Sequence, residues 1–324
     1  MPMYNVETFI GQAIESILSQ SISEWELIIV NDGSKDSSLD IAKRYVSKDC
    51  RIRILNKQNG GLSDARNYGL EATEGQYVHF FDSDDWVSSD FYEQMLDSIP
   101  PQSDPDIIIG GYVVETFDNK KHWSTERRPN TDIQDPKELS NLLSGFLNFA
   151  WNKLFKREFL IEHKLTYEKG LKLIEDCEFM SRVVDYNPKI KYSQAIGYHY
   201  RNDNRPTLSK FFDNSLIELS ERRIKSSRKI LSFIHTQKSF IEQSLNIVRI
   251  NTIRFLIHSL FAFTHNIPIW KKYETIKRIL GTTELKITKQ VNGLTSVSDR
   301  ITSLLITHRA TLLLTILYFA KERK

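Results

Sequence analysis

The feature that most constrains this chain is the alternation of apolar runs with amphipathic helical segments between residues 25 and 86. "WELIIVNDGS" is an apolar run that ends in Asp-Gly, and "DSSLDIAKRYV" after it has helical spacing with Ser and Asp as capping residues. "IRILNKQNGG" and "LSDARNYGLEAT" repeat this pattern, and "QYVHFFDSDDW" is predicted to be the next strand. Strands that alternate with helices indicate an α/β fold with a doubly wound, mostly parallel sheet.

The N-terminus departs from this pattern. Residues 7–20 are predicted to form a helix because apolar residues recur at three- and four-residue spacing, at Ile10, Ala13, Ile14, Ile17 and Leu18. A strand normally precedes such a helix, yet only "MPMYN" stands before it. Loss of a central strand would leave its neighbours without backbone partners. We therefore expect a late-called start or a truncated record, with about five to eight mostly β-branched residues encoded upstream. An inactive remnant is the alternative.

The later segments are less regular. "DIIIGGYVVETFDNKKHW" is predicted to be a strand with a hairpin around Asp118–Lys121, and "PKELSNLLSGFL" a helix that starts at a proline. "WNKLFKREFLIEHKL" and "EDCEFMSRVVDY" are predicted to be helical, and "IKYSQAIGYHYR" one or two short strands. Beyond Asp213 the chain is predicted to be helical.

Charge divides the chain at the same point. Residues 1–213 hold 25 Lys and Arg against 34 Asp and Glu, a net charge of −9, whereas residues 214–324 hold 19 against 7, a net charge of +12. We predict an α/β domain over 1–213 and a basic, apolar helical region over 214–324. Such a block favours a polyanionic partner, of which we favour an anionic membrane surface over nucleic acid.

Two apolar stretches in the basic region bear on this partner. Arg254 and His258 interrupt the first, and His308 and Arg309 interrupt the second, so neither reaches the ~20 uninterrupted apolar residues of a membrane span. If this region binds a membrane, helices that lie in the interface are favoured over helices that span it. A helical bundle packed on the first domain is an equally weighted alternative.

The compartment follows from the cysteines and the N-terminus. The two cysteines, Cys50 and Cys177, lie far apart, and no signal-like stretch opens the chain. This pattern predicts a reducing, cytoplasmic setting, with the basic region at the inner face of the membrane.

Polar residues follow the predicted strands at the edge where ligands bind in doubly wound sheets. They are Asp32, the turn 59–61 and the cluster Asp82-Ser83-Asp84-Asp85. Three carboxylates within four residues repel one another without a cation, and Mg²⁺ or Mn²⁺ with substrate phosphates would relieve that repulsion. The alternative is that Asp84 and Asp85 only cap the following helix. Motifs for a P-loop, a dinucleotide fold or a hydrolase elbow are absent from the sequence, so a metal-bound nucleotide diphosphate is favoured.

Six motifs carry a family resemblance. "PMYNVETFIGQAIESILSQ", "ELIIVNDGSKDSS", "NGGLSDARNYGL", "YVHFFDSDDW", "WNKLF" and "EDCEF" occur in order over roughly residues 2–200. Together they resemble the inverting glycosyltransferases of family 2, which have the GT-A fold. The chain departs from the family where the apolar strand before "P-x-Y-N" would stand.

The resemblance implies roles on the donor side of the site. Tyr4 would border the nucleotide base, Asp32 would accept a hydrogen bond from a uracil-like N–H, and Arg66 would neighbour the nucleotide. Asp82, with Ser83, would contact the ribose or a metal-bound water.

The resemblance also implies a metal and a base. Asp84 would be the direct ligand of Mn²⁺ or Mg²⁺ at the diphosphate, with Asp85 behind it. In the Glu175-Asp176 pair, Asp176 is chosen as the base that takes the acceptor's proton. An acidic helix start favoured by the macrodipole is the alternative.

The acceptor side is implied more loosely. Trp151 and Lys153, with Glu175, would border the acceptor or sugar pocket, although an aromatic residue among apolar neighbours is more often core. Three residues of the "GYHYR" stretch are further candidates, with a partly buried structural histidine as the alternative for the first: His199, Tyr200 and Arg201.

These expectations combine into one function. The chain is predicted to move a sugar from a nucleotide diphosphate, with UDP as the favoured nucleotide, to a carbohydrate or lipid-linked acceptor with inversion, in cell-surface polysaccharide synthesis. A sugar-phosphate nucleotidyltransferase is one alternative, although it usually shows a Gly-rich loop with a basic residue that "PMYNVE" lacks. A non-catalytic scaffold bound through residues 214–324 is the other.

Overall fold

The computed structural model describes residues 1–118, 121–171, 173–203, 212, 215–264, 267–287 and 297–322. The chain divides into two compact units, one of residues 1–130 with 145–205 and one of residues 131–144 with 206–324. The boundary predicted after Asp213 lies outside the described residues.

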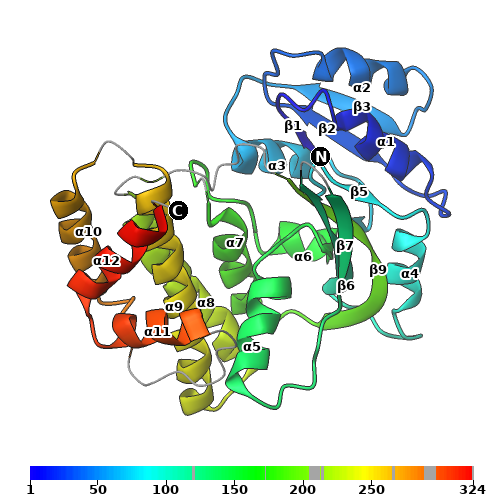
Figure 1. The fold of residues 1–324 in the computed structure, drawn as a ribbon. Coiled ribbons are helices and arrows are strands. Elements are labelled where there is room, and N and C mark those ends of the chain that lie inside the picture. Colours follow the sequence, from blue (N-terminus) through cyan, green and yellow to red (C-terminus); the bar gives the residue numbers. More distant parts are fainter. Residues whose placement is uncertain are drawn as a thin grey trace. The chain divides into compact units, whose positions relative to one another are not determined.

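The first unit begins with a parallel sheet of strand order β1-β2-β3 (Figure 1). Its strands are β1 (Pro2–Met3), β2 (Leu27–Asn31) and β3 (Ile52–Asn56). Pro2 of β1 pairs with Val30 of β2. Pro2 and Met3 thus form a strand of two residues before the first helix, so a short part of the strand that seemed to be missing is present.

Three helices connect and cover these strands: α1 (Ile10–Leu18), α2 (Ser38–Val46) and α3 (Leu62–Glu71). Helix α1 begins later than predicted. The Glu7 carboxylate accepts the Ser37 N–H at 2.9 Å, so this residue serves the neighbouring loop instead of the helix. Ile28 and Val30 of β2 pack with Ala65 of α3 in a buried cluster, which holds the sheet against that helix.

A second, mixed sheet has the strand order β4-β8-β6-β9-β5, with β7 paired to β6. Its strands are β4 (Tyr77–Val78), β5 (Trp86–Val87), β6 (Ile107–Asp118), β7 (Lys121–Arg127), β8 (Lys153–Lys156) and β9 (Ile190–Asn202). Strands β6 and β9 are parallel, and the other pairs are antiparallel. Asp118 pairs with Lys121, which confirms the predicted hairpin.

The segment from Trp151 was predicted to be helical, and this is wrong at its start. Residues 153–156 form β8, and helix α6 (Arg157–Glu162) begins only after it. Strand β8 pairs with β4 on one edge and with β6 on the other. Sheet pairing on both edges satisfies buried backbone groups and overrides the weak local preference for helix. Strand β9, expected as one or two short strands, is a single strand of 13 residues.

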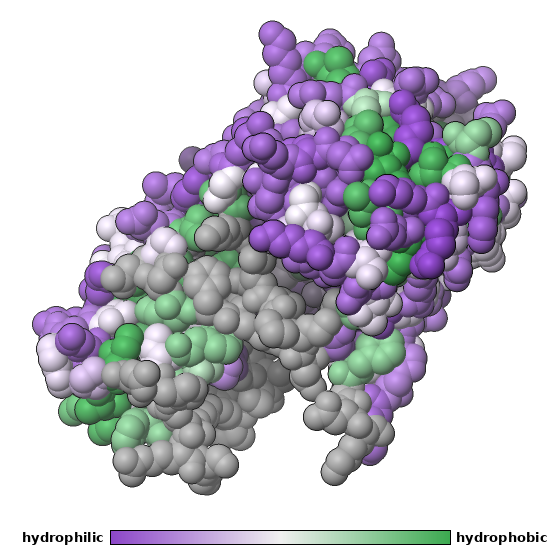
Figure 2. All heavy atoms as spheres, turned by 90° about the horizontal axis from the view of Figure 1, so that it is seen from above, coloured by the Kyte–Doolittle hydropathy of each residue, from purple (hydrophilic) through white to green (hydrophobic). Residues whose placement is uncertain are grey.

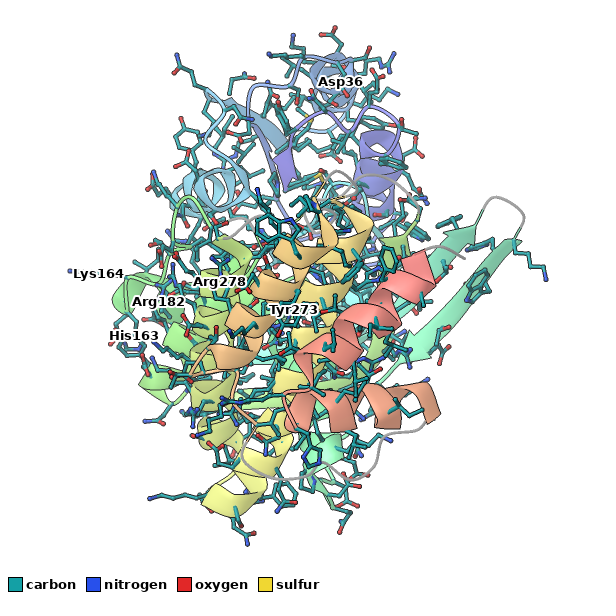
Figure 3. All side chains as sticks on the ribbon, turned by 60° about the vertical axis from the view of Figure 1, so that its left-hand side comes forward. Asp36, His163, Lys164, Arg182, Tyr273 and Arg278 are labelled. Atoms are coloured by element: carbon teal, nitrogen blue, oxygen red, sulfur yellow. The ribbon has the colours of Figure 1, made fainter. Side chains whose placement is uncertain are left out.

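Helices α4 (Phe91–Asp97) and α7 (Glu175–Val183) complete the first unit, and a 3₁₀ turn at Val184–Tyr186 follows α7. Arg182, labelled in Figure 3, anchors α7. Its guanidinium donates to the Glu178 carboxylate at 2.7 Å and to the Thr166 carbonyl at 2.6 Å. This anchor fixes the helix whose first turn carries the acidic pair of the predicted site.

The second unit is helical in the described residues. Its helices are α5 (Pro136–Leu142), α8 (Ser215–Ile234), α9 (Lys238–Ala262), α10 (Ile269–Gly281), α11 (Val297–Thr307) and α12 (Thr311–Glu322), and a π-helical turn (Leu143–Leu147) follows α5. Asp135 and Glu138 form a capping box at α5, next to the predicted proline start. Helix α9 is buried along most of its length, for example at Leu245 and Leu256, so its apolar stretch forms a protein core.

The outer surface bears on the membrane expectation. In the described part of the chain, no helix is both long enough and apolar enough to cross a membrane. Hydrophilic residues cover most of the described surface seen in Figure 2, and the apolar residues between them form small patches. Five exposed apolar side chains lie on α11 and α12: Ile301, Leu304, Leu312, Leu313 and Ile316.

Candidate active site

The carboxylate of Asp32, one residue after β2, is held on all sides. It accepts the N–H groups of Gly60 at 2.9 Å and Gly61 at 2.8 Å, and Lys57 donates to it at 2.5 Å. Gly61 has a φ of +87°, a backbone conformation that L side chains rarely adopt. The turn after β3 is therefore built around the Asp32 side chain.

Lys57 extends this arrangement. Its ammonium group also lies 2.6 Å from Asp64 of α3, and Lys169 reaches the same carboxylate at 2.5 Å. Burial lowers the pKa of Lys57, but the hydrogen bonds and charges of Asp32 and Asp64 outweigh burial and raise that pKa above its usual value. The hydrogen bonds from Lys169 and Lys57 lower the pKa of Asp64. Asp32, which was predicted to accept a hydrogen bond from a uracil-like N–H, is thus one member of a charged network.

Arg66 of α3 is the centre of the site. Its side chain is 2% exposed, and it donates to Asp82 through Nη2 and to Asp176 through Nη1, both at 2.8 Å. Burial lowers the pKa of this guanidinium, but the charges of Asp176 and Asp82 raise it well above its ordinary value. Its carbon Cζ lies 5.0 Å from the centre of the Tyr167 ring. One fixed cation therefore joins two carboxylates that lie 94 positions apart in sequence.

The acidic cluster after β4 divides into different environments. Burial and the charges of Asp84 and Asp176 raise the pKa of Asp82, although Arg66 acts in the opposite direction. Asp85 is 2% exposed and accepts the Tyr198 hydroxyl at 2.6 Å and the Arg201 N–H at 2.8 Å. Burial and the neighbouring carboxylates raise its pKa well above the ordinary value. Asp85 thus ties the cluster to β9.

Asp84 lies between these two carboxylates and is partly exposed. Its main-chain carbonyl accepts the Arg201 Nε–H at 2.9 Å, which holds the loop at this point. Ser83 beside it is buried. Within the described residues, no group of three or more His, Cys, Asp or Glu side chains could hold a metal ion by themselves.

The acidic pair stands in the first turn of α7. Asp176 accepts Arg66 through Oδ1 and the Ala150 N–H through Oδ2 at 3.2 Å. Burial, followed by the charge of Asp176, raises the pKa of Glu175 to about 7. The two neighbours are therefore chemically distinct, since the Asp176 carboxylate has a cation and an amide as partners and Glu175 retains its proton to near neutrality.

Aromatic rings surround Trp151, which is 5% exposed. It stacks on Tyr198 at 4.7 Å, on Phe149 at 5.0 Å and on Tyr200 at 5.4 Å between ring centres. Tyr200 is 38% exposed, so it presents the outer face of this stack. Lys153 has no exposed surface, and contact with an acceptor would need its surroundings to open.

Two further candidates lie apart from this centre. The ring of Tyr4 is 47% exposed directly after β1, where a planar ligand has room to stack on it. The His199 ring forms two hydrogen bonds, from Nδ1 to a Glu115 carboxylate oxygen at 2.7 Å and between Nε2 and the Ser88 hydroxyl at 3.0 Å. The ring also stacks on Trp86. It is a partnered histidine within the sheet.

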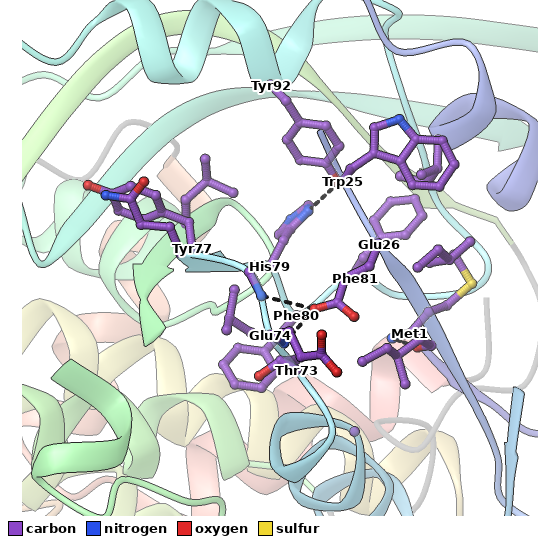
Figure 4. Close-up of a pocket in the computed structure, with 18 of the residues that line it drawn as sticks. Met1, Trp25, Glu26, Thr73, Glu74, Tyr77, His79, Phe80, Phe81 and Tyr92 are labelled. Atoms are coloured by element: carbon purple, nitrogen blue, oxygen red, sulfur yellow. Dashed lines mark hydrogen bonds between the residues drawn. The ribbon is translucent and has the colours of Figure 1, made fainter. Parts of the chain in front are cut away.

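A cavity of about 880 Å³ lies in the first unit but is not the predicted site. Figure 4 shows Trp25, Glu26, His79 and Tyr92 among its lining residues. His79 accepts the Tyr92 hydroxyl at 2.7 Å and donates to the Trp151 carbonyl at 2.5 Å, and burial lowers its pKa to about 4. Among the predicted site residues, Arg66 alone lines this cavity.

The structure thus brings Arg66, Asp82 and Asp176 into direct contact. The Asp32 network lies where β2 and β3 of the parallel sheet end. Sequence reasoning missed Lys57, although its position directly after β3 was a usable signal. It also missed that Ala150 contributes its main-chain N–H, for which a side-chain pattern carries no signal.

The first unit combines a parallel sheet with a mixed sheet and carries acidic residues after its strands. This architecture is the GT-A fold of glycosyltransferases. The family model for glycosyl transferase family 2 matches residues 1–163, and the chain belongs to this family.

Individual relatives agree with this assignment. The chain is 37% identical to EpsH of Bacillus subtilis (strain 168) over 204 residues, 61% of this chain and 58% of that protein. It is 32% identical to the minor teichoic acid biosynthesis protein GgaB of the same organism over 237 residues, 69% of this chain and 26% of GgaB. The matches thus span less than two thirds of these relatives.

Among solved structures, the fold is similar to S. aureus TarS 1-349 in complex with UDP-GlcNAc, with a TM-score of 0.63. The likeness covers 96% of this chain and 90% of the TarS chain at 17% sequence identity. At this identity, the likeness concerns the fold.

Proposed function

We propose that this chain transfers a sugar from a UDP-sugar to a hydroxyl group of a cell-surface carbohydrate or lipid-linked acceptor, with inversion at the anomeric carbon. The observation that carries the proposal is the contact of Arg66 with both Asp82 and Asp176. This contact joins the predicted donor side of the site to the predicted base. The name of GgaB, a teichoic acid biosynthesis protein, supports a cell-surface polymer as the acceptor class. The UDP-GlcNAc bound to TarS 1-349 supports UDP as the nucleotide.

The proposed reaction needs one base. Asp176 takes the proton of the acceptor hydroxyl while its oxygen forms a bond to the anomeric carbon, and the bond from that carbon to the diphosphate oxygen breaks. Because the attack comes from the opposite face, the configuration inverts. Arg66 and the Ala150 N–H hold the two Asp176 oxygens, which limits the rotation of the carboxylate. Near-attack geometry of this kind lowers the entropic part of the barrier.

The residues present fit a divalent cation at Asp84. Asp84 stands in the same short loop as Asp82 and Asp85 and is partly exposed, whereas Asp85 is buried. One or two protein carboxylates with substrate phosphates and water are a common arrangement for Mg²⁺ and Mn²⁺. A cation bound there would neutralise charge on the departing diphosphate.

Donor choice and metal use are tested together. The purified full chain is incubated with UDP-glucose, UDP-galactose, UDP-GlcNAc and GDP-mannose, and released nucleotide is measured with Mn²⁺ and with EDTA. We expect turnover of a UDP-sugar that EDTA abolishes, and a loss of about 10²-fold in Asp84→Ala. Asp90→Ala, an exposed acid in the same segment, is the matched control and keeps parent activity. Unchanged Mn²⁺-dependent turnover in Asp84→Ala would contradict the assignment of Asp84 as the metal ligand.

We further propose that the second unit binds an anionic membrane surface. Residues 214–324 carry a net charge of +12, and α12 exposes Leu312, Leu313 and Ile316 by 62%, 54% and 55%. Apolar side chains beside positive charge are the composition of helices that lie in the membrane interface. A lipid-linked acceptor would be presented at the same surface.

Flotation with vesicles checks the membrane proposal. The parent chain should float with phosphatidylglycerol vesicles at low salt, much less at high salt, and not with phosphatidylcholine alone. The triple change Leu312→Ser, Leu313→Ser and Ile316→Ser should lower binding about tenfold. Ile161→Ser, at a site 47% exposed in the first unit, should bind like the parent. Equal flotation of the triple variant and the parent would exclude α12 as the docking helix.

A further inference from the structure

Lys153 at the start of β8 is buried, with no exposed surface. Its ammonium group donates to the main-chain carbonyls of Phe146 and Phe149 and, at 2.7 Å, to the Asn152 side-chain carbonyl. An ammonium group has three N–H donors, so these acceptors use its full capacity. Lys153 therefore has no donor left for an acceptor sugar.

A charge at this position is costly. Burial lowers the pKa of Lys153 to about 7, and the charge of Asp176 opposes that change. The described residues give Lys153 hydrogen bonds to neutral oxygens and no ion pair. A buried cation without a paired anion lowers stability unless its hydrogen bonds compensate. An apolar side chain would fill the same space but would leave the Phe146 and Phe149 carbonyls without this donor, so the ammonium group serves the turn and not packing alone.

The acceptors of Lys153 belong to the turn that reaches Asp176. Within this turn, the Lys153 N–H bonds to the Ala150 carbonyl at 3.2 Å, and the Ala150 N–H points to Asp176 Oδ2 at 3.2 Å. The far side of the turn is fixed separately, because His79 donates to the Trp151 carbonyl. The ammonium group thus sets the path of the main chain between Phe146 and Trp151.

We propose that Lys153 is a positioning residue for the proposed base. By gathering two main-chain carbonyls and an amide oxygen around one ammonium group, it presents the Ala150 N–H to Asp176 and keeps this carboxylate aimed at the acceptor hydroxyl. The inference rests on the proposed function, since it concerns the same base. Its effect is exerted through Ala150 and not through contact with substrate.

Lys153→Met tests the proposal in the full chain, because methionine keeps most of the length and removes the donors. Misplaced catalytic groups cost about 10- to 100-fold in rate, so we expect kcat to fall by that factor while the KM for the donor stays within about threefold.

Lys156→Met is the matched control in the same strand. Lys156 pairs with Asp104 and Glu158, and this variant should keep the parent kcat. Should Lys153→Met not fold, Ala150→Pro is the second variant, because proline has no N–H to donate to Asp176, and Ala150→Gly, which keeps the N–H, is its control. A parent-like kcat in Lys153→Met, or in Ala150→Pro, overturns the proposal.

A second readout separates this inference from the proposed function. With ¹³C-labelled aspartate, the carboxyl signal of Asp176 is assigned by its loss in Asp176→Asn and is recorded without any substrate. Lys153→Met should shift the position of that signal, because the hydrogen bond from the Ala150 N–H changes, and Lys156→Met should not. An inactive parent chain with the expected shift would refute only the proposed function. An active parent with an unmoved signal would refute only the role of Lys153.

Discussion

Asp176→Asn is expected to lower kcat for sugar transfer by about 10²- to 10⁴-fold, the usual contribution of a positioned base. Asparagine keeps the shape of the side chain and still accepts the Ala150 N–H, but it cannot take a proton. UDP affinity, measured by calorimetry, should stay within about threefold, because Asp176 acts on the acceptor hydroxyl. Released UDP is the measure of kcat.

Glu175→Gln decides between the two adjacent carboxyl groups. Burial raises the pKa of Glu175 to about 7, so this neighbouring carboxyl group is able to exchange a proton near neutrality. We expect this variant to lose less than about tenfold, because the contacts of Asp176 with Arg66 and Ala150 remain. The assignment fails if Glu175→Gln is the inactive variant and Asp176→Asn retains turnover.

Arg66→Met is expected to lower the free energy of unfolding by about 3 kcal/mol, because removal of one partner leaves the others uncompensated. Asp82 and Asp176 would then face each other without a cation, with side chains 24% and 13% exposed. Partial exposure keeps the loss at the lower end of the range for buried pairs. Arg53→Met is the control, since Arg53 pairs with Glu26 while 42% exposed and should cost at most about 1 kcal/mol.

The pH dependence of this loss has a definite sign. The pKa of Asp82 is already raised in the folded chain, by burial and then by Asp84 and Asp176 against the opposing effect of Arg66. A carboxyl group whose pKa is raised by folding stabilises the fold below its unfolded pKa and loses this contribution as pH rises through the folded pKa. Urea unfolding should therefore show a larger difference between Arg66→Met and the parent at about pH 8 than at about pH 4. A difference independent of pH would contradict the electrostatic account.

The strand-end residues could be placed from sequence because the topology gathers them. Asp32 follows β2 and Asp82 follows the β4 segment, so an apolar run with a polar residue after it sufficed to locate both. The GT-A fold followed from the order of the motifs, and the structure has it. The direct contact of Arg66 with Asp176 was not predictable, since 110 positions separate them and no local pattern records their distance.

The errors have a common physical source. Residues 153–156 were assigned to a helix together with the segment that follows them. Their local preference is too weak to decide their state, and pairing with β4 and β6 makes them a strand. Lys153 was expected at a pocket because the family resemblance of "WNKLF" implies it, yet its ammonium group is buried against main-chain carbonyls of its own turn. In both cases the deciding partner lies outside the stretch of sequence that was interpreted.

The division of the first unit into two sheets has a consequence for how it opens. In the described residues the parallel sheet β1-β2-β3 shares no strand pair with the mixed sheet, and the cavity of about 880 Å³ is lined from both. Main-chain links do cross nearby, since Ser21 donates to the Ser89 carbonyl at 2.7 Å. Arg66 of α3 also crosses this division, through its contacts with Asp82 and Asp176. A change in the spacing of the two sheets would therefore change the distance between the nucleotide side and the base without unfolding either sheet.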